Sequence, residues 1–473
     1  MTRALVWFRR DLRLADNPAL QAALDAGLEP VPVFVHAPAE DGSWPPGRAS
    51  NAWLARSLAA LTRDLQAIGS GLIVRQGDSL EVLGALAAQV GATAVFWNRL
   101  YEPSAIARDS RVLSALRVAG LWAESFNGAL LAEPWTVETG AGAPYRVFTP
   151  YWRNASQRLA RVTATQAPTR LPPLPGELSH GDIAQLGLAP AVAWDQGFWD
   201  DWLPGESGAL ELLDAFVDGA AHGYKSQRDL PDRIGTSRLS PHLHFGEISP
   251  RQIVARLDRL QHPPMPEPDR TAFLAELGWR EFACHLLHHF PHTSDQDLSP
   301  KFAGFKWETP DPERLAAWQQ GRTGVPMVDA GMRELWHTGW MHNRVRMLVA
   351  SFLTRNLRYH WRHGARWFWD TLVDADLANN SQGWQWSAGT GADAAPYFRI
   401  FSPVAQAQRF DPAARYIHRW VPELRALPAP AVFAPWQHPD QARQLAPLYP
   451  AMPIVDPKAS RDAALDAYQA MRA

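Results

Sequence analysis

Hydrophobic and polar positions follow two alternating periods along the first 127 residues. Five short apolar runs are typical of buried strands, at 3–8, 30–36, 71–75, 93–98 and 121–127. Four segments with amphipathic helical spacing separate them, at 17–26, 49–68, 79–90 and 104–118. Strands that alternate with helices are typical of βαβ units, so residues 1–127 are predicted to form an α/β domain with a doubly wound, Rossmann-like parallel sheet.

The pattern changes after residue 127. Residues 128–204 are rich in proline and glycine and are predicted to be an interdomain linker. Residues 205–473 are predicted to be a larger all-α domain, because helical spacing dominates to about residue 425 and one terminal helix follows a proline-rich stretch. Within it, 249–252 (Ser-Pro-Arg-Gln) is typical of a capping box with proline at the first helical position.

The composition favours a cytoplasmic globular protein of two or three domains. The chain has 473 residues, of which 46% are hydrophobic. No apolar run reaches the roughly 18 residues of a membrane span, and the amino terminus does not resemble a signal peptide. The single cysteine, Cys284, excludes an intrachain disulfide and a four-cysteine metal cluster. We expect no metal site and no membrane segment.

Charge is unevenly distributed in a chain whose net charge is only −2. Eight arginines lie between Arg322 and Arg366, against two acids in the same stretch. Such a bias can form a local phosphate-binding face, but the same arginines can instead pair with acids elsewhere in the fold. After the first predicted strand, residues 8–13 contain no glycine-rich turn, so no NAD site is expected in the α/β domain.

The segment 374–386 carries the richest candidate chemistry. It combines the carboxylates, amides and indoles of Asp374, Asp376, Asn379, Asn380, Gln382, Trp384, Gln385 and Trp386. Groups of these kinds can hold a flat, hydrogen-bonding, redox-active ring. A polar turn between aromatic-rich helices is the alternative that this segment alone leaves open.

Two further segments add candidate binding groups. Residues 235–241 place three hydroxyls and an arginine beside a predicted helix start, which suits a diphosphate, although a plain helix cap has a similar composition. Residues 340–347 contribute an amide and two arginines. Trp340 and two methionines are interleaved with them, which argues against a purely solvated helix face.

Six collinear motifs resemble those of the photolyase/cryptochrome family. They lie at 7–13, 236–240, 276–282, 340–347, 374–386 and 396–401, and the resemblance runs from Arg3 to beyond Arg399. It implies a flavoprotein that holds FAD in its helical domain and uses blue or near-ultraviolet light to split pyrimidine dimers in DNA.

The resemblance also implies which residues bind FAD. Phosphate and ribityl contacts are expected from Tyr224, Thr236, Ser237, Arg238, Leu239 and Ser240. Residues beside the flavin ring are expected to be Asn343, Arg346, Asp374, Asp376 and Asn380. The working state is the reduced anionic flavin, which favours a nearby cation, and Arg346 paired with Asp374 is expected to supply it.

A lesion pocket is implied on the other side of the cofactor. Glu276 matches the acid that hydrogen-bonds the dimer, Trp279 and Trp386 match the stacking indoles, and Asn343 and Met347 complete the catalytic set. Flipping a dimer out of the helix costs less than flipping intact bases. Further DNA contacts are expected from Arg228, Arg280, Arg344 and Arg399. Methionine cannot donate the proton that (6-4) repair needs, so the cyclobutane dimer is the expected substrate.

The resemblance also implies residues for electron transfer and for light harvesting. Trp384, Trp361 and Trp307 match a relay that carries an electron from the surface to the flavin. An antenna chromophore in the α/β domain is implied near Trp44, Asn51 and Glu102, with methenyltetrahydrofolate preferred over a deazaflavin.

The main alternative to a repair enzyme is a cryptochrome-type blue-light photoreceptor. Asn380 favours repair, because an acid at that position would protonate the reduced flavin more readily. Glu276, the Trp279/Trp386 pair and the lack of a long carboxyl-terminal extension point the same way. The expected partner is ultraviolet-damaged DNA in the cytoplasm, at the nucleoid, and the expected state is a monomer.

Overall fold

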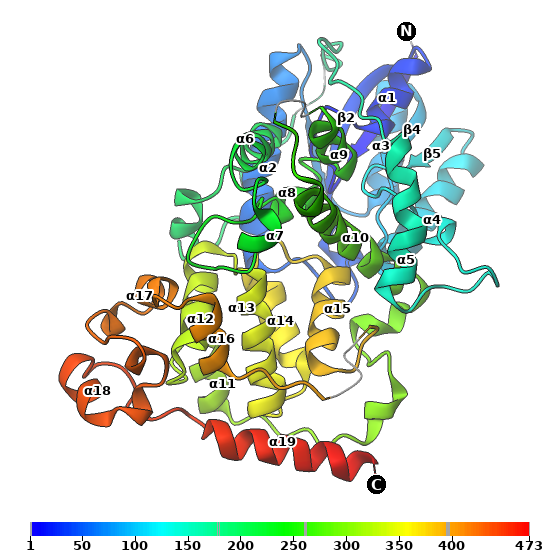
Figure 1. Cartoon of the computed structure of the whole chain (residues 1–473). Coiled ribbons are helices and arrows are strands. Elements are labelled where there is room, and N and C mark those ends of the chain that lie inside the picture. The colour runs from blue at the N-terminus through cyan, green and yellow to red at the C-terminus, as the bar shows by residue number, and fades with distance from the viewer. Residues whose placement is uncertain (1, 177, 179, 260–262, 394–397, 473) are drawn as a thin grey trace.

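The computed structural model describes residues 2–472 except 177, 179, 260–262 and 394–397. Pro396 and Tyr397 of the predicted 396–401 motif therefore lie outside the described residues. Figure 1 shows a sheet-containing region near the amino terminus and a larger helical region that ends at the carboxyl terminus.

Five parallel strands form one sheet with the spatial order β3-β2-β1-β4-β5. They are β1 (Arg3–Phe8), β2 (Glu29–His36), β3 (Ile73–Gln76), β4 (Ala92–Asn98) and β5 (Trp122–Phe126). The connecting helices are α1 (Pro18–Asp25), α2 (Arg48–Ala67), α3 (Ser79–Val90) and α4 (Pro103–Val118). Each predicted strand and helix is present within two residues of its predicted bounds, so the doubly wound sheet is confirmed.

Successive side chains of β1 point to opposite faces of the sheet and pack into two different hydrophobic clusters. Ala4, Val6 and Phe8 pack into one hydrophobic cluster, whereas Leu5 and Trp7 pack into another. The first cluster also contains aromatic side chains from beyond the sheet: Phe198, Trp202 and Phe245. One face of the sheet therefore docks against the helical region.

The rest of the chain is helical, which confirms the predicted all-α region. Its helices are α5 (Phe148–Ala155), α6 (Glu206–Asp218), α7 (Tyr224–Gln227), α8 (Ser240–Phe245), α9 (Pro250–Asp258), α10 (Glu267–His289), α11 (Pro312–Gln319), α12 (Pro326–Thr338), α13 (Asn343–Ser351), α14 (Trp361–Thr371), α15 (Leu377–Ala388), α16 (Pro403–Phe410), α17 (Arg415–Trp420), α18 (Pro439–Leu445) and α19 (Pro457–Arg472). The capping box that begins α9 is present as predicted, with both reciprocal hydrogen bonds between Ser249 and Gln252. The domain bounds at 127 and 204 stay predictions.

Three local features differ from the pattern of the sequence. Helix α5 lies inside the predicted linker, and α18 lies in the proline-rich end where only one helix was predicted. Helical spacing continues through 330–359, but α12 and α13 are separate helices. They are divided at Gly339, whose φ is +68° and where a Cβ would lie 2.7 Å from a methyl of Val373. That crowding comes from distant residues, whereas the left-handed glycine at the end of α12 is itself a local stop signal.

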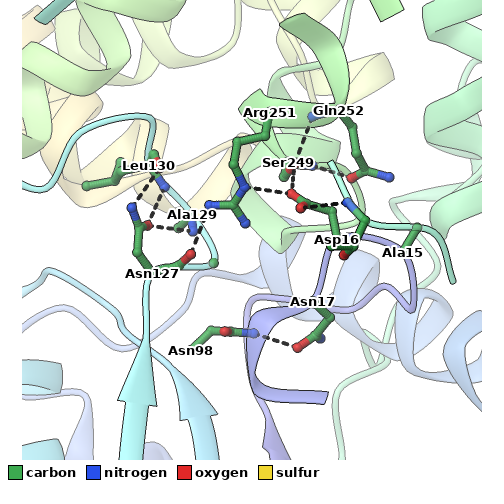
Figure 2. A network of polar contacts seen from close by, with 12 residues as sticks. Ala15, Asp16, Asn17, Asn98, Asn127, Ala129, Leu130, Ser249, Arg251 and Gln252 are labelled. Atoms are coloured by element: carbon green, nitrogen blue, oxygen red, sulfur yellow. Dashed lines mark hydrogen bonds and ion pairs between the residues drawn. The ribbon is translucent and has the colours of Figure 1, made fainter. Parts of the chain in front are cut away.

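The crevice at the carboxyl ends of β1 and β4 is filled with hydrogen bonds (Figure 2). The Asn98 side-chain amide donates to Asp11 Oδ2 at 2.7 Å and to Asn17 Oδ1 at 2.8 Å. From α9, Arg251 donates to Asp16 Oδ2 at 2.9 Å and to the Asn127 carbonyl at 2.9 Å. Doubly wound sheets commonly bind ligands at this switch point. Here the same edge fastens the helical region to the sheet.

Candidate functional site

Helices α10, α13 and α15 and the segment before α8 surround a cavity of about 620 Å³. This volume is typical of small-molecule and cofactor sites. The cavity brings together seventeen of the predicted site residues: Tyr224, Arg228, Ser237, Leu239, Ser240, Glu276, Trp279, Arg280, Asn343, Arg344, Arg346, Met347, Asp374, Asp376, Asn380, Trp384 and Trp386.

Helical periodicity explains why these side chains meet. Glu276, Trp279 and Arg280 are three and four residues apart on α10, and they share one face. Asn343, Arg346 and Met347 have the same spacing on α13. Two such faces, opposed across the cavity, carry the residues that the sequence singled out.

Eight predicted site residues do not line this cavity: Thr236, Arg238, Trp307, Trp361, Arg399, Trp44, Asn51 and Glu102. Arg238, predicted to contact a phosphate, lies instead over the ring of Trp202 at 4.2 Å and 3.6 Å from Asp201. Burial lowers the pKa of Arg238. The guanidinium of Arg399 lies 5.8 Å from the ring of Phe401.

The predicted pair of Arg346 and Asp374 is present. Its two hydrogen bonds run in parallel, from Nη1 to Oδ1 at 3.1 Å and from Nη2 to Oδ2 at 2.8 Å. The Nε–H of Arg346 also donates to the Met341 carbonyl at 2.7 Å. A bidentate pair holds the guanidinium plane in one orientation, so a fixed positive charge lies at the cavity wall.

Asp376 has a structural role as well as a place in the cavity. Its Oδ1 accepts hydrogen bonds from the backbone N–H of Asn379 at 2.8 Å and from the side chain of Asn379 at 2.7 Å, which caps α15. Its Oδ2 lies 3.9 Å from Nδ1 of His244. Burial opposes ionisation, but His244, Arg280 and the capping N–H together hold the pKa of Asp376 below its usual range. The carboxylate is therefore an acceptor at neutral pH.

The amide of Asn380 is held from outside the cavity. Its Nδ2 donates to the Ala365 carbonyl on α14 at 3.0 Å. This bond orients the amide while the side chain remains at the cavity wall, 9% exposed.

Several polar atoms of the cavity wall have no hydrogen-bond partner. Among the described residues they include Nδ1 of His244, Nε of Arg344 and Oε1 of Gln382, all of them buried. Buried polar atoms are rarely left unpaired in a complete native structure. A Cβ at Gly383, which also lines the cavity, would meet no atom within 4 Å. Open space, donors, acceptors and a fixed cation fit the flavin, ribityl and diphosphate groups of FAD.

The lesion-side residues are also paired or packed. Glu276 forms an ion pair with Arg228 across the cavity wall. The ring of Trp279 lies parallel to that of Phe148, with centroids 3.8 Å apart and an interplanar angle of 9°. Met347 and Trp386 complete this side.

The arginine-rich stretch does not form one basic face. Five of its arginines pair with carboxylates: Arg333 with Glu423, Arg344 with Asp229, Arg346 with Asp374, Arg358 with Glu308 and Arg366 with Asp295. Arg355 is buried, which lowers its pKa to about 9. For these five arginines, the alternative of pairing with acids within the fold is the one observed.

The three relay tryptophans occupy different depths. Trp384 lines the cavity, and its ring packs so closely on Gly364 that a Cβ there would lie 2.0 Å away. Trp361 is fully buried and donates to Asp297 Oδ1 at 2.7 Å. The described ring contacts join Trp361 to Trp307 through His360, at centroid distances of 5.5 and 5.1 Å. Their role as a relay stays a prediction.

The three antenna candidates have unrelated surroundings. Trp44 is buried against Trp369 and donates to Asp295, and Asn51 donates to the Pro46 carbonyl. Glu102 forms an ion pair with Arg10 in a separate cavity of about 40 Å³ between the sheet and α10. The described cavities do not unite these residues in one site.

The sequence missed other residues of the cavity. His244 and Gln382 contribute unpartnered polar atoms, and Trp340 lies in the wall. Phe148, behind Trp279, was placed in a linker. Gln382 and Trp340 lay inside motifs already singled out but were given no role, whereas His244 and Phe148 had no pattern of their own.

The fold and the cavity define a two-domain flavin-binding protein. The family model described as DNA photolyase matches residues 4–173, and that described as the FAD binding domain of DNA photolyase matches residues 273–470. A deoxyribodipyrimidine photo-lyase from Agrobacterium fabrum is 43% identical, over 99% of this chain and 98% of the relative. Cryptochrome-1 from Arabidopsis thaliana is 38% identical, over 96% of this chain and 68% of the relative.

Solved structures agree with these relationships. The crystal structure of a bacterial class III photolyase from Agrobacterium tumefaciens superposes with a TM-score of 0.95 at 42% identity, covering 100% of this chain and 98% of the other. The chain belongs to the photolyase/cryptochrome family.

Proposed function

We propose that the protein is a deoxyribodipyrimidine photo-lyase, which repairs cyclobutane pyrimidine dimers in DNA with light and FAD. Full-length similarity to curated photo-lyases supports this activity. The observation that carries it is that one cavity is lined both by the predicted flavin contacts and by the predicted lesion contacts. A cofactor and a flipped-out dimer held in that cavity are neighbours.

Each side chain then has a defined task. When held in this cavity in its reduced form, FAD would supply reversible light-driven electron transfer to the dimer. Arg346, held by Asp374, stabilises negative charge on the flavin side of the cavity. Asn380, oriented by the Ala365 carbonyl, offers an amide instead of an acidic proton. Trp279 and Trp386 stack on the dimer bases.

Glu276 is assigned a different partner in the free protein and in the DNA complex. Without DNA it pairs with Arg228, and in the proposed complex its carboxyl group hydrogen-bonds the dimer while Arg228 turns to a phosphate. The ion pair thus keeps both side chains ordered at the mouth of the site.

The test is light-dependent loss of thymine dimers from an irradiated oligonucleotide. Photoreduced protein should remove them, and protein kept in the dark should not. Glu276→Ala should lower the repair yield while photoreduction of the flavin continues. Intact dimers after illumination, with normal flavin cycling, would contradict the proposal.

A photoreceptor is the second candidate, favoured by the similarity to Cryptochrome-1 over 96% of this chain. It predicts a light-dependent change in protein conformation, measurable by limited proteolysis, without loss of dimers. The same illuminated sample therefore separates the two functions.

The antenna, the oligomeric state and the location are part of the proposal. We favour methenyltetrahydrofolate as antenna over a deazaflavin, a monomer, and a cytoplasmic location at nucleoid DNA. The absorption spectrum of the purified protein distinguishes the two antennas, and sedimentation tests the monomer. In the part of the chain that the structure describes, no helix is long and apolar enough to cross a bilayer.

A further inference from the structure

We propose that Phe148 on α5 is a positioning residue for Trp279 and thereby sets the affinity for damaged DNA. This inference rests on the proposed function, because it concerns the indole assigned to stack on the dimer. Phe148 itself lies outside the predicted helical domain and outside the motifs that the sequence singled out.

The geometry of the stack defines the role. The rings of Phe148 and Trp279 are 3.8 Å apart and within 9° of parallel. At van der Waals contact, the phenyl ring covers one face of the indole. Trp279 is half-buried and lines the cavity, so its other face is the one left for a base. A base stacked there would form the third layer of a stack that begins at Phe148.

Phe148 is itself held firmly. It is 8% exposed, and its ring is stacked with that of Trp152 at 6.4 Å and set edge-on to that of Phe282 at 5.9 Å. Trp152 in turn packs on Gly278 of α10, where a Cβ would lie only 2.5 Å from the indole. No side chain at 278 separates the two helices. The ring behind Trp279 therefore has little freedom to move.

The consequence for binding is preorganisation. A free indole at a cavity mouth samples several rotamers, and fixing it on binding costs affinity. Packing against Phe148 restricts Trp279 before DNA arrives. Contacts between arginines and phosphates do not depend on this ring, so Phe148 is expected to act on the discrimination between damaged and undamaged strands.

The experiment measures the dissociation constants of the FAD-loaded full chain for two single-stranded oligonucleotides, one with a single thymine dimer and one undamaged. Phe148→Leu should weaken binding of the dimer strand about three- to tenfold, in line with the strength of an aromatic pair. Binding of the undamaged strand and the rate of flavin photoreduction should not change. If Phe148→Leu does not fold, Phe148→Met is the second variant, because its flexible unbranched side chain adapts to the space left by the ring.

A double-mutant cycle separates positioning from general packing. In a Trp279→Ala background, Phe148→Leu should cause no further loss, because its effect passes through the indole. The matched control is Tyr151→Leu, which removes a buried ring of the same helix from contact with Phe282 and His285 of α10. It should lower stability but keep the preference for the dimer.

Three results would overturn the inference: wild-type affinity in both Phe148 variants, additive losses in the cycle, or an equal loss in Tyr151→Leu. If the wild type itself does not prefer the dimer strand, the proposed function fails, and this result is distinct from the other three.

Discussion

The switch-point crevice of the sheet and the cavity of the helical region each bring charged and amide side chains together. In the crevice, the amides of Asn17 and Asn98 and the carboxylate of Asp16 are all hydrogen-bonded (Figure 2). Among the described residues there, Nη2 of Arg251 and Nε of Arg9 are left without a partner. In the cavity, several buried polar atoms lack partners around about 620 Å³ of space.

This difference indicates that the polar cluster in the crevice is structural and that the one in the cavity binds a ligand. Both contain charged and amide side chains, so the presence of these residue types does not separate them. The degree of hydrogen-bond satisfaction does, because leaving buried groups unpaired costs stability unless another molecule completes them. Substitutions in the crevice should therefore affect folding, and those in the cavity should affect the cofactor and light chemistry.

The largest expected effect is on the photoreduction of oxidised flavin. Trp384→Phe should abolish photoreduction of oxidised flavin, because it removes the one proposed relay tryptophan that lines the described cavity, yet chemically reduced protein should still repair dimers. Trp53→Phe is the control, since Trp53 is equally buried but packs against the sheet. Absorption spectra under illumination and repair assays give the two readouts. Equal loss of both activities would remove Trp384 from the relay.

The next effect is on cofactor affinity. Asp374→Ala leaves the guanidinium of Arg346 without its bidentate partner. Removing one member of such a buried pair costs about 2 kcal/mol or more, so FAD should bind at least about thirtyfold more weakly. Flavin fluorescence titration measures this. Glu423→Ala breaks the pair with Arg333, which has the same side-chain exposure as Arg346, and should leave FAD binding intact. Equal affinities in the two variants would contradict the comparison.

For a substitution in the crevice we expect the opposite result, a loss of stability with FAD binding retained. Asparagine tolerates the positive φ of position 16 as aspartate does. Asp16→Asn therefore removes the charge that faces Arg251 without straining the backbone. Because hydrogen bonds between charged groups contribute about 1.5–3 kcal/mol, the free energy of unfolding should fall by about that amount. Urea titration measures it, with the exposed Asp25→Asn as control. The FAD content of the folded fraction should stay the same, and a loss of FAD would mean that the crevice takes part in binding.

The smallest effect concerns the open space at Gly383. Gly383→Ala should stabilise α15 by up to about 1 kcal/mol, because alanine favours a helix, and should weaken FAD binding modestly by filling the cavity. Gly84→Ala in α3 meets equally open surroundings and should give only the stabilisation. Thermal unfolding and FAD titration of both variants test this. Unchanged FAD affinity in Gly383→Ala would place the cofactor away from α15.

Sequence periodicity was sufficient for the elements of the sheet region and for the helical character of the rest. The strands and helices up to Phe126 follow from steric and hydrophobic patterns over a few residues. The motif at 340–347 also singled out Asn343, Arg346 and Met347, which the structure places on one face of α13. The pairing of Arg346 with Asp374 was expected from the family resemblance, and the structure supplies its geometry.

Tertiary structure alone decided which polar groups find partners. The arginines between 322 and 366 form ion pairs with acids as distant in sequence as Asp229 and Glu423. The ring of Trp279 stacks on that of Phe148, which lies 131 positions earlier in the sequence. No local pattern encodes such pairings, because they depend on how separate helices pack. The sequence by itself determined the elements of the sheet region and indicated the family; the packing of α5, α10, α13 and α15 decided which side chains remain free for a ligand.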